Sequence, residues 1–350
     1  MEKKHIIGLV LTIVIATAGG LTYYFGFYLP SLQKTPGNDI GEVTGLPEST
    51  PPNASLLLKD IDDSTIANVS LAEIVERLNN GSLNLVKCTI EKDGKTLNLA
   101  GFNPLELMDI YGLYYADEFE SIAKDQAKST LNYSGFYLGD PAYYKDAVGE
   151  YSMIAISINA TWLRQYDSTY GDFRIYGQVW STSQKIKDVE TLKIKTELVV
   201  KVKVNGILNI SLSKSNLSTI IGLNYTSYEW GYFDNSSNKS WGPKVHNGTT
   251  IASIAQYINI SSSQYNVSFI SVDGWGLKWK YNKTQMEDGI TGVKINTPQE
   301  DLNNEGKQTI LNNLDNTQQL GHNDGPFRVI LPGHTRDRYQ KAVVEIQFSV

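Results

Sequence analysis

Basic side chains gather near the C-terminal end of the sequence. Arg328 lies between His322 on one side and His334, Arg336 and Arg338 on the other. Guanidinium and imidazole groups form charge-assisted hydrogen bonds with phosphate and carboxylate oxygens. This group of residues could therefore hold an anion such as a phosphate. The alternative is a structural role, in which Arg328 ties a strand to a neighbouring carbonyl or carboxylate.

Outside this group, the sequence offers little side-chain chemistry. Cys88 is the single cysteine, which excludes an intramolecular disulfide framework and a cysteine-rich metal site. The four histidines have no close spacing, so a histidine-built metal site is not favoured. The sequence contains no nucleophile elbow, zinc-protease helix, phosphate-binding loop or dinucleotide glycine motif. Two Ser-x-x-Lys segments, at Ser121 and Ser211, lack the Lys-Thr-Gly motif that accompanies them in penicillin-binding enzymes, so we treat them as chance matches.

The segment that carries Arg328 has a counterpart earlier in the chain. Both segments contain a glycine turn, a short apolar strand, a charged connection and a second strand that is preceded by a lysine. We interpret them as an internal repeat with an offset of 154 residues. The matching residues are Gly171, Phe173, Arg174, Lys187 and Val189, and Gly325, Phe327, Arg328, Lys341 and Val343. Because the arginine is repeated, a structural role is favoured for both copies.

The N-terminal segment indicates a membrane anchor. Residues 6–29 are uncharged and long enough to span a bilayer as a signal-anchor helix. Lys3 and Lys4 precede this span, which places residues 1–5 in the cytoplasm and the rest of the chain outside the cell. The alternative is a cleaved signal peptide with a small-residue cleavage site at 16–18.

The rest of the chain is expected to form a tether and two domains. Residues 30–54 are rich in proline and read as an extended linker. A length of 350 residues agrees with two domains of ordinary size, which we place at 55–195 and 196–350. Helical and strand-like patterns interleave irregularly, which predicts an α+β fold with antiparallel or mixed sheets.

Periodicity and turn residues predict the elements inside these domains. Helices are expected over 70–78, with Ser70 as N-cap, and over 104–110, with Asn103 as N-cap and Pro104 at the first position. Strands are expected over 85–90, 96–99, 153–158 and 198–204, a strand, turn and strand over 267–279, a long surface excursion over 285–324, and a closing hairpin over 327–348.

Asn-X-Ser/Thr sequons are abundant on the predicted outer side of the span. Their number predicts a heavily glycosylated surface, as in an archaeal cell-surface protein. The net charge of −6 and the lack of a basic run beyond residues 1–5 disfavour nucleic-acid binding. The expected partners are the membrane, through the N-terminal helix, and cell-surface proteins or glycans. The sequons are Asn53, Asn68, Asn80, Asn132, Asn159, Asn209, Asn216, Asn224, Asn235, Asn238, Asn247, Asn259, Asn266 and Asn282.

A family resemblance covers roughly residues 55–350 and is clearest in the last part of the chain. The motifs that carry it are Val204-Asn205-Gly206, Val272-Asp273-Gly274-Trp275, and Gly325-Pro-Phe-Arg-Val-Ile-Leu-Pro-Gly333 followed by Lys341. In this order they resemble the molybdopterin-binding domain of the sulfite oxidase-like oxidoreductases, and the first domain resembles it more weakly. The resemblance implies two tandem, degenerate copies of that mixed-sheet domain.

The resemblance also implies candidate site residues. In that family a cysteine thiolate ligates molybdenum, and arginine, lysine and histidine side chains hold the pterin phosphate. Cys88 would then be the metal ligand, and Arg328, His322 and Arg174 would bind the cofactor.

The sequence departs from the family at this point. The glycine, asparagine and arginine that follow the family's cysteine are missing after Cys88, and the second domain has no cysteine. The N-terminus also lacks the arginine pair of a signal for exporting folded, cofactor-loaded enzymes. We therefore expect Cys88 to be a small buried side chain, no bound cofactor, and a non-catalytic binding or structural module. The alternative is a molybdopterin-dependent oxidoreductase with Cys88 as metal ligand.

Overall fold

The structure is a computed structural model of the whole chain. It describes residues 45–140, 152–177, 179–217, 219–220, 223, 225–234, 239–277, 279–288, 308–316, 318–331 and 340–350. Outside these residues lie the predicted span, most of the linker, Asn224, Asn235 and Asn238 of the sequons, and His334, Arg336 and Arg338. None of the helices within the described ranges is long and apolar enough to cross a membrane.

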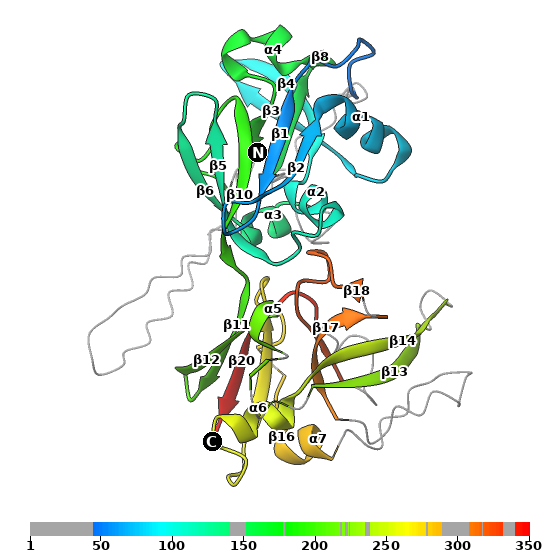
Figure 1. Cartoon of the computed structure of the whole chain (residues 1–350), viewed down its shortest axis with the longest axis vertical. Coiled ribbons are helices and arrows are strands. Elements are labelled where there is room, and N and C mark those ends of the chain that lie inside the picture. Colours follow the sequence, from blue (N-terminus) through cyan, green and yellow to red (C-terminus); the bar gives the residue numbers. More distant parts are fainter. Residues whose placement is uncertain are drawn as a thin grey trace, which may run out of the picture. The chain divides into compact units, whose positions relative to one another are not determined.

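Residues 55–197 contribute two sheets. In sheet A the strand order is β2-β1-β10-β5-β6, and β1 lies between β2 and β10 (Figure 1). In sheet B the order is β3-β4-β7-β8, with β9 also pairing with β7. The strands are β1 (Ser55–Lys59), β2 (Thr65–Ser70), β3 (Leu85–Lys92), β4 (Lys95–Phe102), β5 (Ala116–Ala123), β6 (Lys128–Asn132), β7 (Met153–Ile158), β8 (Thr161–Trp162), β9 (Arg174–Tyr176) and β10 (Val189–Glu197). We call this set of strands the first copy.

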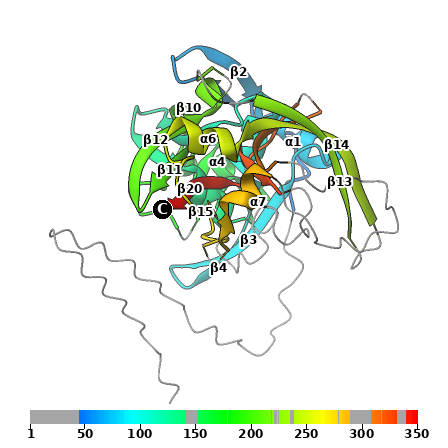
Figure 2. The same cartoon turned by 90° about the horizontal axis from the view of Figure 1, so that it is seen from below.

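Residues 199–349 repeat the same strand order. Sheet C has the order β12-β11-β20-β15-β16, so that β20 lies between β11 and β15 (Figure 2), and sheet D has β13-β14-β17-β18 with β19 pairing with β17. The strands are β11 (Val199–Val204), β12 (Ile207–Ser213), β13 (Tyr225–Asp234), β14 (Lys239–Thr250), β15 (Asn266–Ser271), β16 (Tyr281–Asn282), β17 (Ile310–Asp315), β18 (Gln318–Gln319), β19 (Arg328–Ile330) and β20 (Val343–Ser349). We call this set the second copy.

The pairing directions repeat as well. The first strand of each copy pairs in parallel with the last one, β1 with β10 and β11 with β20, while the other neighbours in sheets A and C are antiparallel. A parallel pair needs a long connection, and here sheets B and D are part of that connection. The α+β class with mixed sheets is therefore confirmed.

Short helices connect the strands and begin where their caps predict. Ser70 Oγ accepts a hydrogen bond from the amide of Glu73, and Asn103 caps a helix with Pro104 at its start, both as expected. In the second copy Thr250 caps the counterpart of that helix. The helices are α1 (Leu71–Asn80), α2 (Pro104–Ile110), α3 (Tyr133–Leu138), α4 (Leu163–Tyr166), a 3₁₀ turn (Ser168–Tyr170), α5 (Lys214–Leu217), α6 (Ile251–Tyr257) and α7 (Lys283–Glu287).

The repeat found in the sequence keeps its register in the structure. Gly171 and Gly325 both have a positive φ, of 72° and 75°. A Cβ at either glycine would lie 2.3 Å from the Cα of the same partner position, Asp188 in the first copy and Ala342 in the second. The two partners also share an unusual positive φ, 50° and 48°. Glycine is required because no Cβ fits between these two segments.

Three predicted features are wrong. The closing segment is not a hairpin, because β19 belongs to sheet D and β20 to sheet C, with only an isolated bridge between Val329 and Gln340. The expected surface excursion contains β17, whose first four residues are buried, including Asn312 and Asn313. The second strand expected after β15 is replaced over its described residues by turns, in which Gly274 and Gly276 have positive φ.

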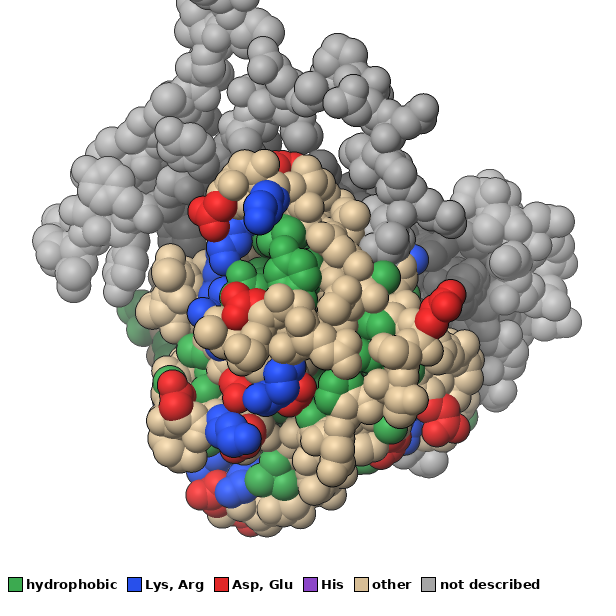
Figure 3. Space-filling model, turned by 90° about the horizontal axis from the view of Figure 1, so that it is seen from above, with side chains coloured by type: hydrophobic (Ala, Val, Ile, Leu, Met, Phe, Trp, Pro, Cys, Tyr) green, Lys and Arg blue, Asp and Glu red, His purple; other side chains and the backbone are tan. Residues whose placement is uncertain are grey.

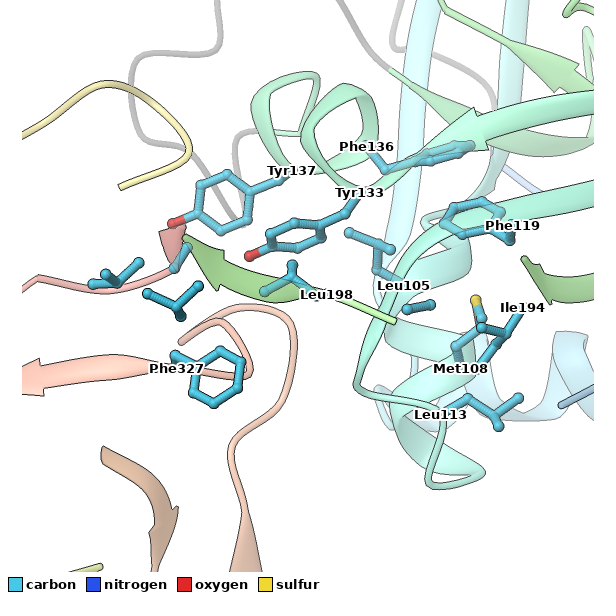
Figure 4. Close-up of a cluster of buried hydrophobic side chains, with 14 of the residues drawn as sticks. Leu105, Met108, Leu113, Phe119, Tyr133, Phe136, Tyr137, Ile194, Leu198 and Phe327 are labelled. Carbon is cyan, nitrogen blue, oxygen red and sulfur yellow. The ribbon is translucent and has the colours of Figure 1, made fainter. Parts of the chain in front are cut away.

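One large apolar core serves both copies. It includes Phe119 and Phe136 of the first copy, whose rings are stacked, and Phe327 of the second. In Figure 4 Tyr133 of α3 and Leu198, which precedes β11, lie on the side of this cluster toward Phe327. The surface seen in Figure 3 is mostly uncharged, with scattered basic, acidic and apolar side chains. This agrees with a charged fraction of only 19%.

Candidate functional site

Cys88 is enclosed in a small apolar cluster on sheet B. It lies on β3 opposite Leu99 of β4 and is 8% exposed. Its neighbours in the cluster include Ile158 and the rings of Tyr170 and Tyr176. Burial raises the pKa of the Cys88 thiol to about 12. Without a bound metal the side chain is therefore a protonated thiol at neutral pH, and a metal would have to displace that proton inside an apolar cluster.

The setting of Cys88 predicts slow chemical labelling. At pH 8 its thiolate fraction should be about a thousandfold below that of an ordinary cysteine, and enclosure slows access further. Labelling of the native full-length protein with an aromatic disulfide reagent should therefore be slow and should accelerate on unfolding in guanidinium chloride. Fast labelling of the folded chain at pH 8 would contradict the enclosed thiol.

Arg174 lies beside the same cluster. Its guanidinium carbon is 4.1 Å from the ring centre of Tyr170 and 4.8 Å from that of Tyr176. Lys92 donates a hydrogen bond of 2.7 Å to the Tyr170 hydroxyl. This bond and the charges of Lys92 and Arg174 lower the pKa of Tyr170 from its ordinary value, and they outweigh burial, which raises it. Lys187 is 5.3 Å from the ring. None of these three cations forms a direct ion pair within the described part of the chain, although the charges of Lys187 and Lys92 help to lower the pKa of Asp167.

Arg328 has a different environment from Arg174. Its Nη2 donates to both carboxylate oxygens of Asp315, at 2.8 and 2.7 Å. His246 Nδ1 lies 2.6 Å from Asp315 Oδ1, and Asn312 Nδ2 donates to the same oxygen at 2.9 Å. Burial alone would raise the pKa of Asp315, but the hydrogen bond from His246 and the charge of Arg328 outweigh it and hold this pKa well below its usual range. We call these four residues the Asp315 network.

The Asp315 network occupies positions that are apolar in the first copy. Leu99 pairs with Ile158 on strands β4 and β7, and His246 pairs with Asp315 on β14 and β17. Asn159 and Asn316 support this alignment of the two copies. The side-chain oxygen of Asn159 accepts a hydrogen bond from the amide of the residue before Leu99, and that of Asn316 accepts one from the amide of the residue before His246. Asn312 likewise takes the place of Ala155, because Asn312 pairs with Arg328 on β19 and Ala155 pairs with Arg174 on β9.

The same sheet face is therefore an apolar cluster in one copy and a buried ion network in the other. The sequence signal for this difference is the polar composition of β17, Ile-Leu-Asn-Asn-Leu-Asp, which also led to its being predicted as a loop.

His322 is not part of the Asp315 network. Its amide donates a hydrogen bond of 2.7 Å to Asp109 Oδ2 of α2, and its Nδ1 contacts Asp109 Oδ1. Tyr133 of α3 donates to the carbonyl oxygen of His322 at 2.7 Å. The side chain is fully buried. His322 therefore joins the segment before β19 to two helices of the first copy.

A polar cavity of about 520 Å³ lies elsewhere in the first copy. Arg164 of α4 forms ion pairs with Asp172 at 2.7 Å and with Asp188 at 2.9 Å along its wall. Lys124 and Glu190 also line it. Neither Cys88 nor Arg174 does. Sequence reasoning missed this cavity, because its charged residues come from separate segments and have no motif spacing.

The structure does not fit a molybdopterin in the manner that the family resemblance implies. The one candidate metal ligand is a buried neutral thiol. In the second copy the three basic side chains at the family's positions each contact a carboxylate: Arg328 with Asp315, Lys341 with Asp324 at 2.6 Å, and His322 with Asp109. Within the described ranges there is also no group of three or more potential metal ligands.

Comparisons with known proteins give no family assignment. No protein-family model and no curated protein matches the sequence. Among solved structures, the sulfane dehydrogenase SoxCD from Paracoccus pantotrophus is similar at 9% sequence identity with a TM-score of 0.28. The match covers 65% of this chain and 58% of that chain. A TM-score of this size carries no argument about fold or activity.

Proposed function

We propose that the protein is a membrane-anchored extracellular glycoprotein in which two degenerate molybdopterin-binding-type domains act as a non-catalytic binding or structural module. The observation that carries this proposal is the state of Cys88. Its thiol is enclosed by apolar and aromatic side chains, and burial raises its pKa to about 12. A side chain held neutral in this way contributes packing and does not contribute metal chemistry.

The candidate phosphate-binding residues of the second copy support the same proposal. A side chain that holds a phosphate must direct its donors at the ligand. Arg328 instead directs Nη2 at both oxygens of Asp315, and Lys341 directs its ammonium group at Asp324. An incoming phosphate at Arg328 would have to displace Asp315 and leave this largely buried carboxylate without its counter-charge, which is costly.

The extracellular placement rests on the sequence. It follows from the uncharged span at 6–29, the proline-rich tether and the many sequons. Several sequon asparagines within the described residues are exposed, among them Asn53, Asn68, Asn209 and Asn259. Exposure is what an oligosaccharide on the folded protein requires.

Metal and pterin analysis of the full-length protein, purified from its native membranes, tests this proposal. We expect molybdenum and tungsten far below one atom per chain and no pterin fluorescence after acid extraction. The fraction that carries the protein should be the membrane fraction, and alkaline carbonate should not release it. Stoichiometric molybdenum or tungsten would overturn the non-catalytic proposal, and release by carbonate would overturn the anchor.

One observation favours the alternative, a molybdopterin-dependent oxidoreductase. In the first copy Arg174, Lys92 and Lys187 form no direct ion pair among the described residues, and all three lie around the ring of Tyr170 in the cluster that holds Cys88. Under this alternative a Cys88→Ser variant should lose a metal that the wild type holds. Under the proposal above neither protein holds one.

A further inference from the structure

The free edges of sheets A and C coincide with sequons. Each sheet ends in two edge strands, β2 and β6 in sheet A, and β12 and β16 in sheet C. All four edge strands carry a sequon asparagine: Asn68, Asn132, Asn209 and Asn282. An edge strand presents unpaired backbone groups to solvent and can pair with an edge of another chain, so proteins usually protect such strands.

Two of these edges have the usual protection and two do not. Strand β6 carries Lys128, and β16 is only two residues long. Strands β2 and β12 contain no charged residue and no proline. They expose apolar side chains instead, with Ile66 at 41%, Ile207 at 72% and Leu208 at 54%. Within the described residues β2 pairs only with β1, and β12 only with β11.

The sequon asparagines on β2 and β12 are open to modification. Asn68 and Asn209 are exposed, and neither side chain takes part in a hydrogen bond within the described part of the chain. Asn209 is also the extra residue of a bulge, since Val202 and Lys203 pair with Ile210 and Leu208 and skip it. A substituent on either amide nitrogen can therefore extend into solvent.

In two other sequons the fold makes the asparagine amide nitrogen inaccessible, so these sites serve as internal controls for Asn68 and Asn209. Asn247 Nδ2 is buried. Asn216 Nδ2 donates a hydrogen bond of 3.1 Å to the carbonyl oxygen of Ser211, while its Oδ1 accepts from the amide of Ser213 at 2.7 Å. A sugar on either nitrogen would require the surrounding segment to move.

We propose that Asn68 and Asn209 carry N-linked oligosaccharides that cover the edges of β2 and β12 and keep copies of the protein from pairing through them. This inference rests on the extracellular placement proposed above. The donor is a lipid-linked sugar phosphate, acted on by a transferase of the host. The amide nitrogen forms a bond to the anomeric carbon of the sugar, and the bond from that carbon to the phosphate oxygen breaks. The nitrogen loses one proton, and the lipid phosphate leaves as an anion that carries the matching negative charge. A hydrated oligosaccharide on an edge strand excludes a neighbouring strand by volume.

Glycopeptide mass spectrometry of the full-length protein from its glycosylating host gives the first test. We expect occupancy at Asn68, Asn209, Asn53 and Asn259, and none at Asn247. Unmodified Asn68 and Asn209 beside occupied Asn53 and Asn259 would overturn the inference and leave the glycoprotein proposal standing. A chain without sugar at any sequon would overturn both.

Self-association gives the second test. The double variant Asn68→Gln/Asn209→Gln should shift from monomer to dimer and larger species in sedimentation velocity. The variant Asn53→Gln/Ser261→Ala also removes two sequons, but neither residue lies on an edge strand, and it should stay monomeric. Ser211→Ala removes the Asn209 sequon without altering the asparagine, so it should reproduce the effect of Asn209→Gln.

Lysines placed on β2 and β12 of the sugar-free variant distinguish pairing through these edges from a general loss of solubility. Adding Ile66→Lys and Leu208→Lys to the Asn68→Gln/Asn209→Gln variant should restore the monomer, because a charged side chain on an edge strand also prevents pairing. If the sugar-free double variant stays monomeric, or if the lysines do not restore the monomer, the edge-covering role is refuted.

Discussion

An Asp315→Asn variant is expected to lose about 3 kcal/mol of the free energy of unfolding. The substitution keeps the size of the side chain but removes the negative charge that Arg328 and His246 share. Arg328 and Asp315 are both only 14% exposed, so the arginine would remain buried without its counter-charge. Guanidinium chloride unfolding, followed by tryptophan fluorescence, measures the change.

The pH dependence of stability should change in the same variant. Because the folded-state pKa of Asp315 lies below its ordinary value, its contribution is present above the unfolded pKa of about 4 and is lost as pH falls toward the folded one. The stability difference between the wild type and the variant should therefore shrink as the pH falls below about 4. A difference that stays constant in acid would show that the charge of Asp315 is not what stabilises the fold.

Glu120→Gln provides the matched control for Asp315→Asn. Glu120 forms a cross-strand ion pair of 3.1 Å with Lys128, whose side chain is 55% exposed. Such surface pairs contribute about 1 kcal/mol or less. If both variants lose the same stability, the buried network has no special importance.

Alanine at Gly101 or Gly248 is expected to cost at least about 3 kcal/mol of unfolding free energy. These glycines occupy the same position on β4 and β14, where each strand approaches the central strand of its sheet. A Cβ at Gly101 would lie 2.1 Å from the carbonyl oxygen of Ile154 and 2.7 Å from the Cα of Ala155. A Cβ at Gly248 would lie 2.1 Å from the carbonyl oxygen of Leu311. These contacts are with backbone atoms, which cannot rotate away as a side chain can.

Hydrogen exchange with mass spectrometry should locate the damage in these two variants. Amides of β4 and β7 should lose protection in Gly101→Ala, and those of β14 and β17 in Gly248→Ala. Gly45→Ala is the control, because its Cβ would meet only the Lys87 ammonium group at 3.8 Å, an ordinary contact. Wild-type stability in Gly101→Ala or Gly248→Ala would mean that the strands are less closely packed than described.

Local signals in the sequence predicted local structure well. The start of α2 was predicted to the residue, because Asn103 and Pro104 are both strong start signals. The strands expected over 85–90 and 96–99 are likewise present, as the paired strands β3 and β4. The repeat was detectable because its glycines are required by backbone contacts that recur in both copies.

The errors arose where distant segments decide the outcome. Strand β17 is polar because Asn312 and Asp315 serve a buried network, and a polar run normally indicates a loop. The two strands of the closing segment enter different sheets, which depends on partners far away in the chain.

Site prediction had the same limit. His322 and Arg328 were singled out as candidate phosphate-binding residues, but the carboxylates that they contact could not be foreseen. Asp109 lies 213 positions from His322 in the sequence, and no spacing rule joins them.

The place of β20 in its sheet has a consequence for how the protein is made. A chain made from its N-terminus delivers β11 and β15 before β20, the strand that both of them need as a neighbour. Until residues 343–349 emerge, two inner strands of sheet C each present an open side, a state prone to mispairing. A premature stop that removed only this strand would therefore take away the middle of the sheet, and the truncated product would be a substrate for quality-control proteases.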